Sequence, residues 1–298
     1  MADKVGFIGL GIMGKPMAEN LIKGKCGLMV YDIDPRKCSG LLTSGVEASD
    51  SPSGISARCG VIFMIVPNGK IVKDICFGEN GLCKTLAAGS TVVDMSSVTP
   101  GDSREVALRL AEMSVDFIDA PVSGGEPKAI DGTLAIMAGG KKEAFEKVLP
   151  YFKMMGSTAT LVGGIGSGST AKLVNQMIVN LTIAAVSEAF VLASKAGVDV
   201  QKVYEAIRAG LAGSTVLDAK FPMMAGRNFK PGGRLDINMK DIKNVMDTAF
   251  SLDVPVPFTS QLLEIMKALK ADGKLGDDHS GIVQYFEKLA GVEVKKQG

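Results

Sequence analysis

The first half of the chain alternates short apolar runs with segments of helical periodicity. Runs that are apolar on both faces are typical of strands buried in a parallel sheet, and helices between them would cover its two faces. We predict strands over Lys4–Ile8, Leu28–Tyr31, Val61–Val66, Thr91–Met95, Phe117–Val122, Leu134–Met137 and Thr158–Val162, and helices up to about Lys23, over Ser103–Glu112 and over Lys142–Phe152.

The second half changes character after Gly163, where no convincing strand pattern remains. Helical patterns dominate, and the segment from Gly210 to Arg234, richer in Gly and Pro, is expected to wind over the surface. We therefore expect an α/β domain over residues 1–163 and an all-α domain over residues 164–298, joined by a long helix. The predicted helices are Ser169–Lys195, Val200–Ala209, Met239–Leu252, Ser260–Lys270 and His279–Leu289.

The helix predicted over Ser169–Lys195 is the longest element, and at about 1.5 Å per residue it would be roughly 40 Å long. Ser167 or Ser169 can cap its start, and Gly197 can end it. It is apolar almost all round, which is typical of a helix buried on every side. Polar residues interrupt the apolar stretch, so we expect a buried helix and not a membrane span: Asn180, Thr182, Ser187 and Glu188.

Three polar residues near the start of this helix, Lys172, Asn175 and Gln176, fall on one face by their spacing. From the helix alone, Lys172 is either an ordinary solvated residue of the first turns or a placed catalytic group.

A glycine loop follows the first predicted strand, where Gly9, Gly11 and Gly14 have the GxGxxG spacing. The bare pattern is weak evidence, but here it follows a strand, opens a helix and precedes an acidic residue, Asp32, at the end of the next strand. The first glycine permits a tight turn, the second admits a pyrophosphate and the third lets helix and strand pack closely. The pattern predicts a dinucleotide site.

Asp32 can accept hydrogen bonds from an adenosine ribose, and its charge would repel a 2′-phosphate. We therefore expect NAD as the cofactor. Arg36 lies close enough to soften that preference, which leaves use of NADP possible.

The proton chemistry of a carbonyl reduction needs a donor, commonly His, Lys or Tyr. The one histidine, His279, lies far out in the C-terminal helices and is expected to be a solvated or capping residue. No Tyr-xxx-Lys pair occurs, and a single histidine without clustered cysteines removes the zinc-dependent route, so no metal site is expected. A lysine remains, and an ordinary lysine, with a pKa of about 10.4, is the acid that a reduction needs at neutral pH.

Two further stretches are candidate site loops. Ser123, Gly124 and Gly125 follow a strand end, where backbone N–H groups and a hydroxyl could bind a carboxylate; the alternative is an ordinary turn. Lys240-Asp241 begins a charged turn that, by itself, indicates a solvated helix end.

Composition narrows the class of protein. Of 298 residues, 46% are hydrophobic and 22% charged, which is typical of a globular protein of two domains. A net charge of +1 gives no reason to expect nucleic acid or a membrane surface as a partner. Five cysteines without a CxxC favour reduced thiols, and the first residues enter a strand pattern without a basic leader, so we expect a cytoplasmic protein.

Together these motifs resemble the β-hydroxyacid dehydrogenase family, also called the 3-hydroxyisobutyrate dehydrogenase family. The resemblance covers essentially the whole chain and rests on four separated motifs in the family's order: FIGLGIMGKPMAENL from Phe7, DAPVSGG from Asp119, GSGSTAKLVNQ from Gly166 and MKD from Met239. It implies a Rossmann-type domain joined by a long helix to an all-helical domain, and assembly into homodimers or homotetramers.

The resemblance also implies roles for single residues. Lys172 matches the catalytic lysine, and Asn175 the residue that helps to orient it and the substrate. Ser123, Gly124 and Gly125 match the turn that holds the substrate carboxylate. The matching cofactor contacts are Gly9, Leu10, Gly11, Ile12, Met13, Gly14, Asp32, Pro67, Asn68, Ser97 and Lys240.

The implied reaction is reduction of a small carboxylated aldehyde, with tartronate semialdehyde expected from the stretches SGGEPKAIDGTL and GLAGSTVLDAK. The alternatives are the substrates of other family members, namely 3-hydroxyisobutyrate, 2-hydroxymethylglutarate, succinic semialdehyde or glyoxylate. A dinucleotide-binding protein without catalysis is the alternative from another class, and retention of Lys172 and Asn175 argues against it.

Overall fold

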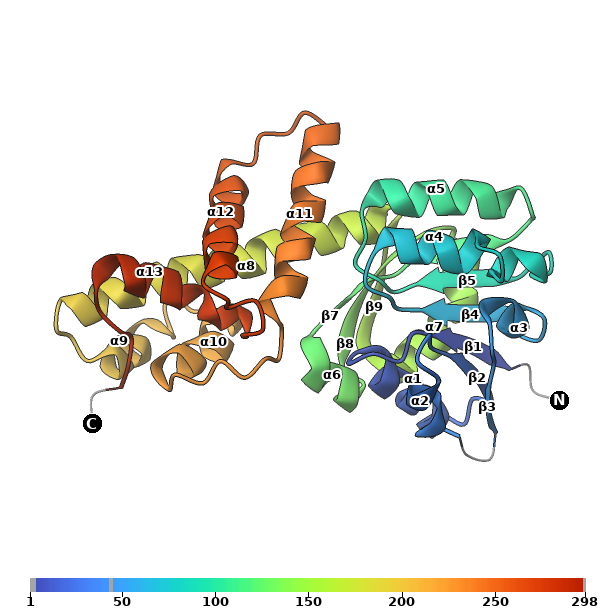
Figure 1. The fold of residues 1–298 in the computed structure, drawn as a ribbon, viewed down its shortest axis with the longest axis horizontal. Coiled ribbons are helices and arrows are strands. Elements are labelled where there is room, and N and C mark those ends of the chain that lie inside the picture. Colours follow the sequence, from blue (N-terminus) through green and yellow to red (C-terminus); the bar gives the residue numbers. More distant parts are fainter. Residues whose placement is uncertain (1–3, 43–44, 297–298) are drawn as a thin grey trace. The chain divides into compact units, whose positions relative to one another are not determined.

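The computed structural model describes residues 4–42 and 45–296, and the chain forms two compact units, residues 1–172 and 173–298 (Figure 1). The first unit combines a sheet with helices and the second is helical, which confirms the predicted fold class. The helix α8, Ser167–Lys195, begins in the first unit and continues into the second. The predicted domain division at residues 163 and 164 stays a prediction.

Among the described residues, nine strands form one sheet in the order β3-β2-β1-β4-β5-β6-β8-β7, with β9 paired to β8. The strands from β3 to β6 in this order run parallel, as predicted, but β8 is antiparallel to β6 and β7. The prediction of one strand over Phe117–Val122 is wrong, because the ladder breaks at Ala120 and Pro121, and a proline has no N–H to donate. The strands are β1 Val5–Ile8, β2 Leu28–Tyr31, β3 Val46–Ala48, β4 Val61–Met64, β5 Thr91–Asp94, β6 Asp116–Asp119, β7 Val122–Ser123, β8 Leu134–Gly139 and β9 Gly156–Gly163.

The helices of the first unit include four short ones that sequence reasoning did not predict. Helices of five to nine residues span too few turns to show a clear apolar period. The helices are α1 Gly14–Lys23, α2 Pro35–Ser39, α3 Pro52–Ser56, α4 Gly69–Phe77, α5 Pro100–Ala111, α6 Gly125–Asp131 and α7 Lys142–Met155, with a 3-10 turn η1 at Leu82–Lys84.

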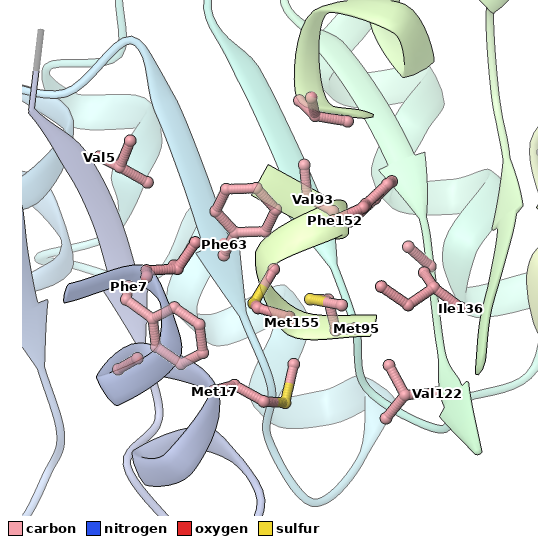
Figure 2. Packing of buried hydrophobic residues seen from close by; sticks show 14 of the residues in the cluster. Val5, Phe7, Met17, Phe63, Val93, Met95, Val122, Ile136, Phe152 and Met155 are labelled. Atoms are coloured by element: carbon pink, nitrogen blue, oxygen red, sulfur yellow. The ribbon is translucent and has the colours of Figure 1, made fainter. Parts of the chain in front are cut away.

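Apolar cores cover both faces of this sheet. On one face Phe7 and Phe63 stack with ring centroids 6.5 Å apart, and Phe152 of α7 meets Phe63 edge-on at 6.1 Å (Figure 2). On the other face Ile62 and Val92 belong to a second cluster of buried residues, which includes residues of α3, α4 and α5. A sheet packed on both faces explains why its strands read as continuous apolar runs.

The helical unit contains one helix that contradicts our expectation. The segment from Gly210 to Arg234 includes α10, Thr215–Ala225, which buries Leu217, Phe221 and Met224 and does not merely cross the surface. Ser214 caps α10 by accepting the Leu217 N–H at 3.0 Å, a signal that the sequence did carry. The other helices are α9 Val200–Ile207, α11 Leu235–Ser251, α12 Pro257–Ala271 and α13 Val283–Ala290, with a 3-10 turn η2 at His279–Ile282.

Helix α8 is not buried on every side, which corrects the sequence prediction. Val174, Ile178 and Leu192 are 50%, 61% and 72% exposed. A single stripe is buried instead, at a spacing of three and four: Ser169, Leu173, Gln176, Asn180, Ile183, Ser187 and Phe190. By length and composition α8 alone among the described helices could cross a membrane, yet its buried stripe is rich in hydrogen-bonding side chains, which favours a helix packed in a folded domain.

His279 is buried, so the prediction of a solvated or capping residue is wrong. Its Nδ1 lies 3.1 Å from Asn180 Oδ1, and its neighbour Asp278, fully buried, caps the turn η2. Although burial opposes ionisation, electrostatic interactions with His279 and Lys220 and a hydrogen bond from the Ser280 N–H lower the pKa of Asp278 to about 2. Asp278 also accepts the N–H groups of Gly232 and Gly233, so it fixes the loop before α11.

Candidate functional site

The candidate residues of the first unit follow strands that end at the same edge of the sheet. The loops after β1, β2, β4, β5 and β6 all leave from carboxyl ends, because these strands are parallel and in register. Ligands of open α/β sheets bind at this edge. The topology therefore gathers loops from five separate sequence segments.

The glycine loop between β1 and α1 needs its glycines for different physical reasons. Gly9 has φ +91°, and a Cβ there would lie 2.2 Å from the Ile65 carbonyl oxygen. A Cβ on Gly14 would lie 1.9 Å from the Gly9 oxygen, so the backbone is packed too closely at both positions for any side chain. Gly11 faces open space within 4 Å, which leaves the backbone accessible to a ligand. These properties fit a pyrophosphate-binding turn.

Asp32 is buried and oriented by the backbone of this loop. Its Oδ2 accepts the Leu10 N–H at 2.7 Å, and its Oδ1 accepts the Asp34 N–H at 2.9 Å. Lys37, and not Arg36, is the cation beside it, with Nζ 3.2 Å from Oδ1. Arg36 instead makes two bonds to Asp34, at 2.8 and 3.0 Å, and the expectation that Arg36 softens the preference for NAD stays a prediction.

A groove of about 410 Å³ lies against the glycine loop, a volume within the range of small-molecule sites. Gly11, Ile12 and Lys37 line it, together with Lys15 of α1 and Glu126 of α6. The start of α1 has no side-chain cap and no acidic residue in its first turn, which suits an anionic group there. The residues present therefore fit a dinucleotide. A groove of about 590 Å³ on the helical unit contains none of the candidate residues.

Pro67, Asn68 and Ser97 follow β4 and β5 at the same edge. Asn68 has a structural role, because its Oδ1 accepts the Ile71 N–H at 3.0 Å and caps α4. Ser97 is half-buried, while its neighbour Ser96 is buried and accepts the Val66 N–H at 2.8 Å. Ser96 thus ties the two loops together and leaves Ser97 closer to the surface.

The turn at Ser123, Gly124 and Gly125 connects β7 to α6. Gly124 has φ +140° and Gly125 has φ +69°, conformations that side chains other than glycine rarely adopt. Lys128 packs its aliphatic stem against Gly124, where a Cβ would lie 2.7 Å away. The backbone conformation requires the two glycines, and the turn lies on an accessible loop.

Lys172 lies beside this turn. Its Nζ donates to the Val122 carbonyl oxygen at 2.8 Å, one residue before Ser123. Neither Ser167 nor Ser169 caps α8 as predicted; both lie inside the helix. The capping oxygens come from Asp119, at the end of β6, which accepts the Gly166 and Ser169 N–H groups at 2.8 and 2.7 Å.

Asn175 and Lys240, both in the helical unit, belong to one chain of polar contacts. Asn175 Nδ2 donates to Gln176 Oε1 at 3.0 Å, and Gln176 Nε2 donates to Asp241 Oδ2 at 2.6 Å. Lys240 Nζ lies 2.9 Å from Asp241 Oδ1. The sequence prediction of a solvated helix end is wrong for this pair, since both residues lie within α11 and Asp241 is buried.

Three groups of the candidate site were not predicted from the sequence: Lys37, the Asp119 carboxylate and the Val122 carbonyl. Lys37 carried a usable signal, its place on the short helix after Asp32. Asp119 is the first residue of the DAPVSGG motif, but the Ser169 N–H that it accepts lies 50 residues further along the sequence. Lys172 and Val122 are also 50 residues apart in the sequence, and because every residue has a backbone carbonyl, the sequence cannot indicate which one accepts a hydrogen bond.

Comparison with protein families matches both parts of the chain. Residues 4–164 match the NAD binding domain of 6-phosphogluconate dehydrogenase, and residues 166–286 match the NAD-binding domain of NADP-dependent 3-hydroxyisobutyrate dehydrogenase.

Individual relatives are similar over nearly their whole length. The 2-hydroxy-3-oxopropionate reductase of Escherichia coli K12 is 42% identical over 96% of this chain and 98% of its own. The 2-(hydroxymethyl)glutarate dehydrogenase of Eubacterium barkeri is 34% identical over 98% of this chain and 97% of its own. Among solved structures, the 3-hydroxyisobutyrate dehydrogenase of Mycobacterium tuberculosis is 28% identical, with a TM-score of 0.88 over 95% of this chain and 99% of its own.

The pairing of Lys37 with Asp32 generates a prediction about the cofactor. In Lys37→Ala the carboxylate loses its compensating ammonium, so a 2′-phosphate should be repelled more strongly. We expect the ratio of kcat/KM with NADPH to kcat/KM with NADH to fall about fivefold, which corresponds to about 1 kcal/mol for a partly exposed pair. Initial rates with both cofactors measure the ratio.

Arg36→Ala is the matched control, because Arg36 pairs with Asp34 and its side chain is 90% exposed. Its ratio should stay within about twofold of the wild type. An effect of Arg36→Ala that equals or exceeds that of Lys37→Ala would contradict the assignment of Lys37 as the cation that acts on Asp32.

Proposed function

The chain belongs to the β-hydroxyacid dehydrogenase family, whose enzymes depend on NAD or NADP and act on small molecules, and we propose that it reduces tartronate semialdehyde to glycerate with NADH as the preferred cofactor. 2-Hydroxy-3-oxopropionate is another name for tartronate semialdehyde, so the 42% identity to a 2-hydroxy-3-oxopropionate reductase supports the choice of this substrate. Asp32, oriented by Leu10 N–H toward the edge of the sheet, supports NADH.

The observation that carries the proposal is the bond from Lys172 Nζ to the Val122 carbonyl at 2.8 Å. It fixes an ammonium beside the turn that begins at Ser123. In tartronate semialdehyde one carbon separates the carboxylate from the aldehyde, so a molecule held by its carboxylate on this turn would present its carbonyl oxygen close to the ammonium.

In the proposed mechanism the nicotinamide, when bound, supplies the hydride to the carbonyl carbon. Ser123 and the N–H groups of Gly124 and Gly125 hold the carboxylate. Lys172 donates a proton to the carbonyl oxygen as negative charge develops on it, and regains a proton from solvent afterwards. Asn175, three residues further along α8, helps to orient the lysine and the substrate. In the reverse direction the neutral amine of Lys172 would accept the hydroxyl proton.

A panel of aldehydes tests the substrate. We expect tartronate semialdehyde to give the highest kcat/KM in a panel that also contains glyoxylate, succinic semialdehyde and the semialdehydes of 3-hydroxyisobutyrate and 2-hydroxymethylglutarate, measured at 340 nm with NADH and NADPH. Another member leading the panel would reject the named substrate and leave the family reaction intact. No turnover with any member would favour a dinucleotide-binding protein without catalysis.

Lys172→Ala tests the proton donor. Because positioned proton transfer contributes about 10²–10⁴-fold, we expect kcat to fall by at least about 10²-fold while the dissociation constant for NADH changes little. Lys195→Ala, at the other end of the same helix, is the control and should turn over like the wild type. Near-normal turnover of Lys172→Ala would remove this lysine from the mechanism.

We also propose that the protein forms homodimers or homotetramers, which the exposed apolar residues at the ends of α11 and α12 support. Phe250, Leu252, Val254 and Phe258 are 87%, 61%, 51% and 73% exposed within nine residues of sequence. Single exposed apolar residues are ordinary, but a group of them marks an association surface.

Light scattering after size exclusion tests the assembly. The wild type should have the mass of two or four chains, and the double variant Phe250→Glu/Phe258→Glu should shift toward one chain. Leu289→Glu, a change at an exposed leucine of α13, serves as control and should keep the wild-type mass. A monomeric wild type at micromolar concentration would refute the proposal.

A further inference from the structure

Asp119 connects two parts of the candidate site that are far apart in the sequence. It is the last residue of β6, and the loop to the Ser123 turn starts directly after it. The residue is 1% exposed, and its carboxylate accepts the Gly166 and Ser169 N–H groups at the start of α8. The carboxylate therefore binds the helix that carries Lys172, while its backbone leads into the turn that would hold the substrate.

The start of α8 lies in direct contact with the strands. A Cβ on Gly168 would lie 2.3 Å from the Asp119 carbonyl oxygen and 2.4 Å from that of Met137. A Cβ on Gly139, which is paired with Asp119 across the sheet, would lie 2.6 Å from Asp119 Oδ1. Side chains larger than hydrogen would separate the helix from the carboxylate, so the two glycines permit the bonds.

The two bonds restrain the helix at the turn just before Lys172. Ser169 is the third residue of α8, and Lys172 follows three residues later on the same side of the helix. A rotation or shift of the first turn would move the Lys172 Cα, and with it the base of the side chain whose ammonium bonds to the Val122 carbonyl. Ser103 of α5, whose Oγ lies 2.9 Å from that of Ser169, supports this turn from another element.

We propose that Asp119 is a positioning residue, which sets the place of the Lys172 ammonium relative to the substrate-binding turn by capping α8 from the end of β6. The inference rests on the proposed role of Lys172 in proton transfer. Asp119 acts through the helix and does not itself touch the reacting groups. A cap from a residue next to the helix start, such as the predicted caps Ser167 or Ser169, would not link α8 to the substrate-binding turn.

Asp119→Asn tests the proposal with little change in volume. The amide keeps one acceptor oxygen but replaces the other by a donor, so one of the two helix N–H groups loses its partner. Burial raises the pKa of Asp119 although the helix N–H groups and the Ser169 hydroxyl oppose this, so a neutral side chain should be tolerated by the fold. The control is Asp116→Asn at the start of the same strand, where the carboxylate is partly exposed and pairs with Lys141.

We expect kcat of Asp119→Asn to fall about 10–100-fold, since small misplacements of a catalytic group have effects of this size. The dissociation constant for NADH, measured by fluorescence, should stay within about twofold, because the glycine loop and Asp32 make no bond to Asp119 among the contacts described. Asp116→Asn should match the wild type in both measurements.

Competitive labelling of lysines, followed by mass spectrometry, gives a readout that does not depend on turnover. The labelling rate of Lys172 should rise several-fold in Asp119→Asn, while that of Lys195 at the far end of α8 stays unchanged. If Asp119→Asn does not fold, Gly168→Ala replaces it, because the added Cβ must push the helix start away from the intact carboxylate. The same changes in kcat and labelling are expected.

A folded Asp119→Asn with wild-type kcat and wild-type labelling of Lys172 would overturn the positioning role. Failure of the proposed role of Lys172 would give a different result: Lys172→Ala would turn over at a near-normal rate, whatever the kcat of Asp119→Asn. An equal rise in labelling of Lys172 and Lys195 would also reject the proposal, since it would indicate general loosening of the fold.

Discussion

The parallel order of the strands from β3 to β6 is the constraint on which the first unit depends. Because these strands run the same way in register, the chain must leave the sheet at one edge after each of them. The glycine loop, Asp32 and the loops after β4, β5 and β6 meet there although they lie far apart in the sequence. The antiparallel strand β8 ends with Gly139 beside Asp119 of β6, and β9, parallel to β8, ends with Gly163 beside Gly139 and leads directly into α8.

Backbone segments approach one another closely at this edge of the sheet, because glycines occupy the points of contact. Gly9 and Gly14 let β1 and α1 meet without a side chain between them, and Gly168 does the same where α8 meets β6 and β8. Each contact brings a helix start against strand ends. At α1, Lys15 and Met17 donate their N–H groups to the Gly11 and Met13 carbonyls and Pro16 has none, while at α8 the carboxylate of Asp119 accepts the Gly166 and Ser169 N–H groups. Close backbone approach thus places a helix start beside strand ends at both positions.

The helical unit organises its polar groups differently, through buried hydrogen bonds between helices. Gln176 and Asn180 of α8 both reach Asn238 of α11, and Asn180 also meets His279. Buried polar groups are costly unless they are paired, so this network favours one arrangement of α8, α11 and η2 over slipped alternatives. Because Asn175 and Lys240 are bound to its members, their positions follow from the same network. The single histidine is part of this framework.

The fold class, the glycine loop and its acidic partner could be predicted from the amino-acid sequence, because they depend on local patterns: apolar runs, glycine spacing and a strand end. It also marked Lys172 through a motif. The contacts of each group, by contrast, follow from the folded chain. The cap of α8 comes from Asp119, the cation beside Asp32 is Lys37, and the acceptor for Lys172 is a backbone oxygen. Hydrogen bonds between distant segments depend on how the strands are ordered, and a side chain's spacing along one helix carries no information about its partner on another.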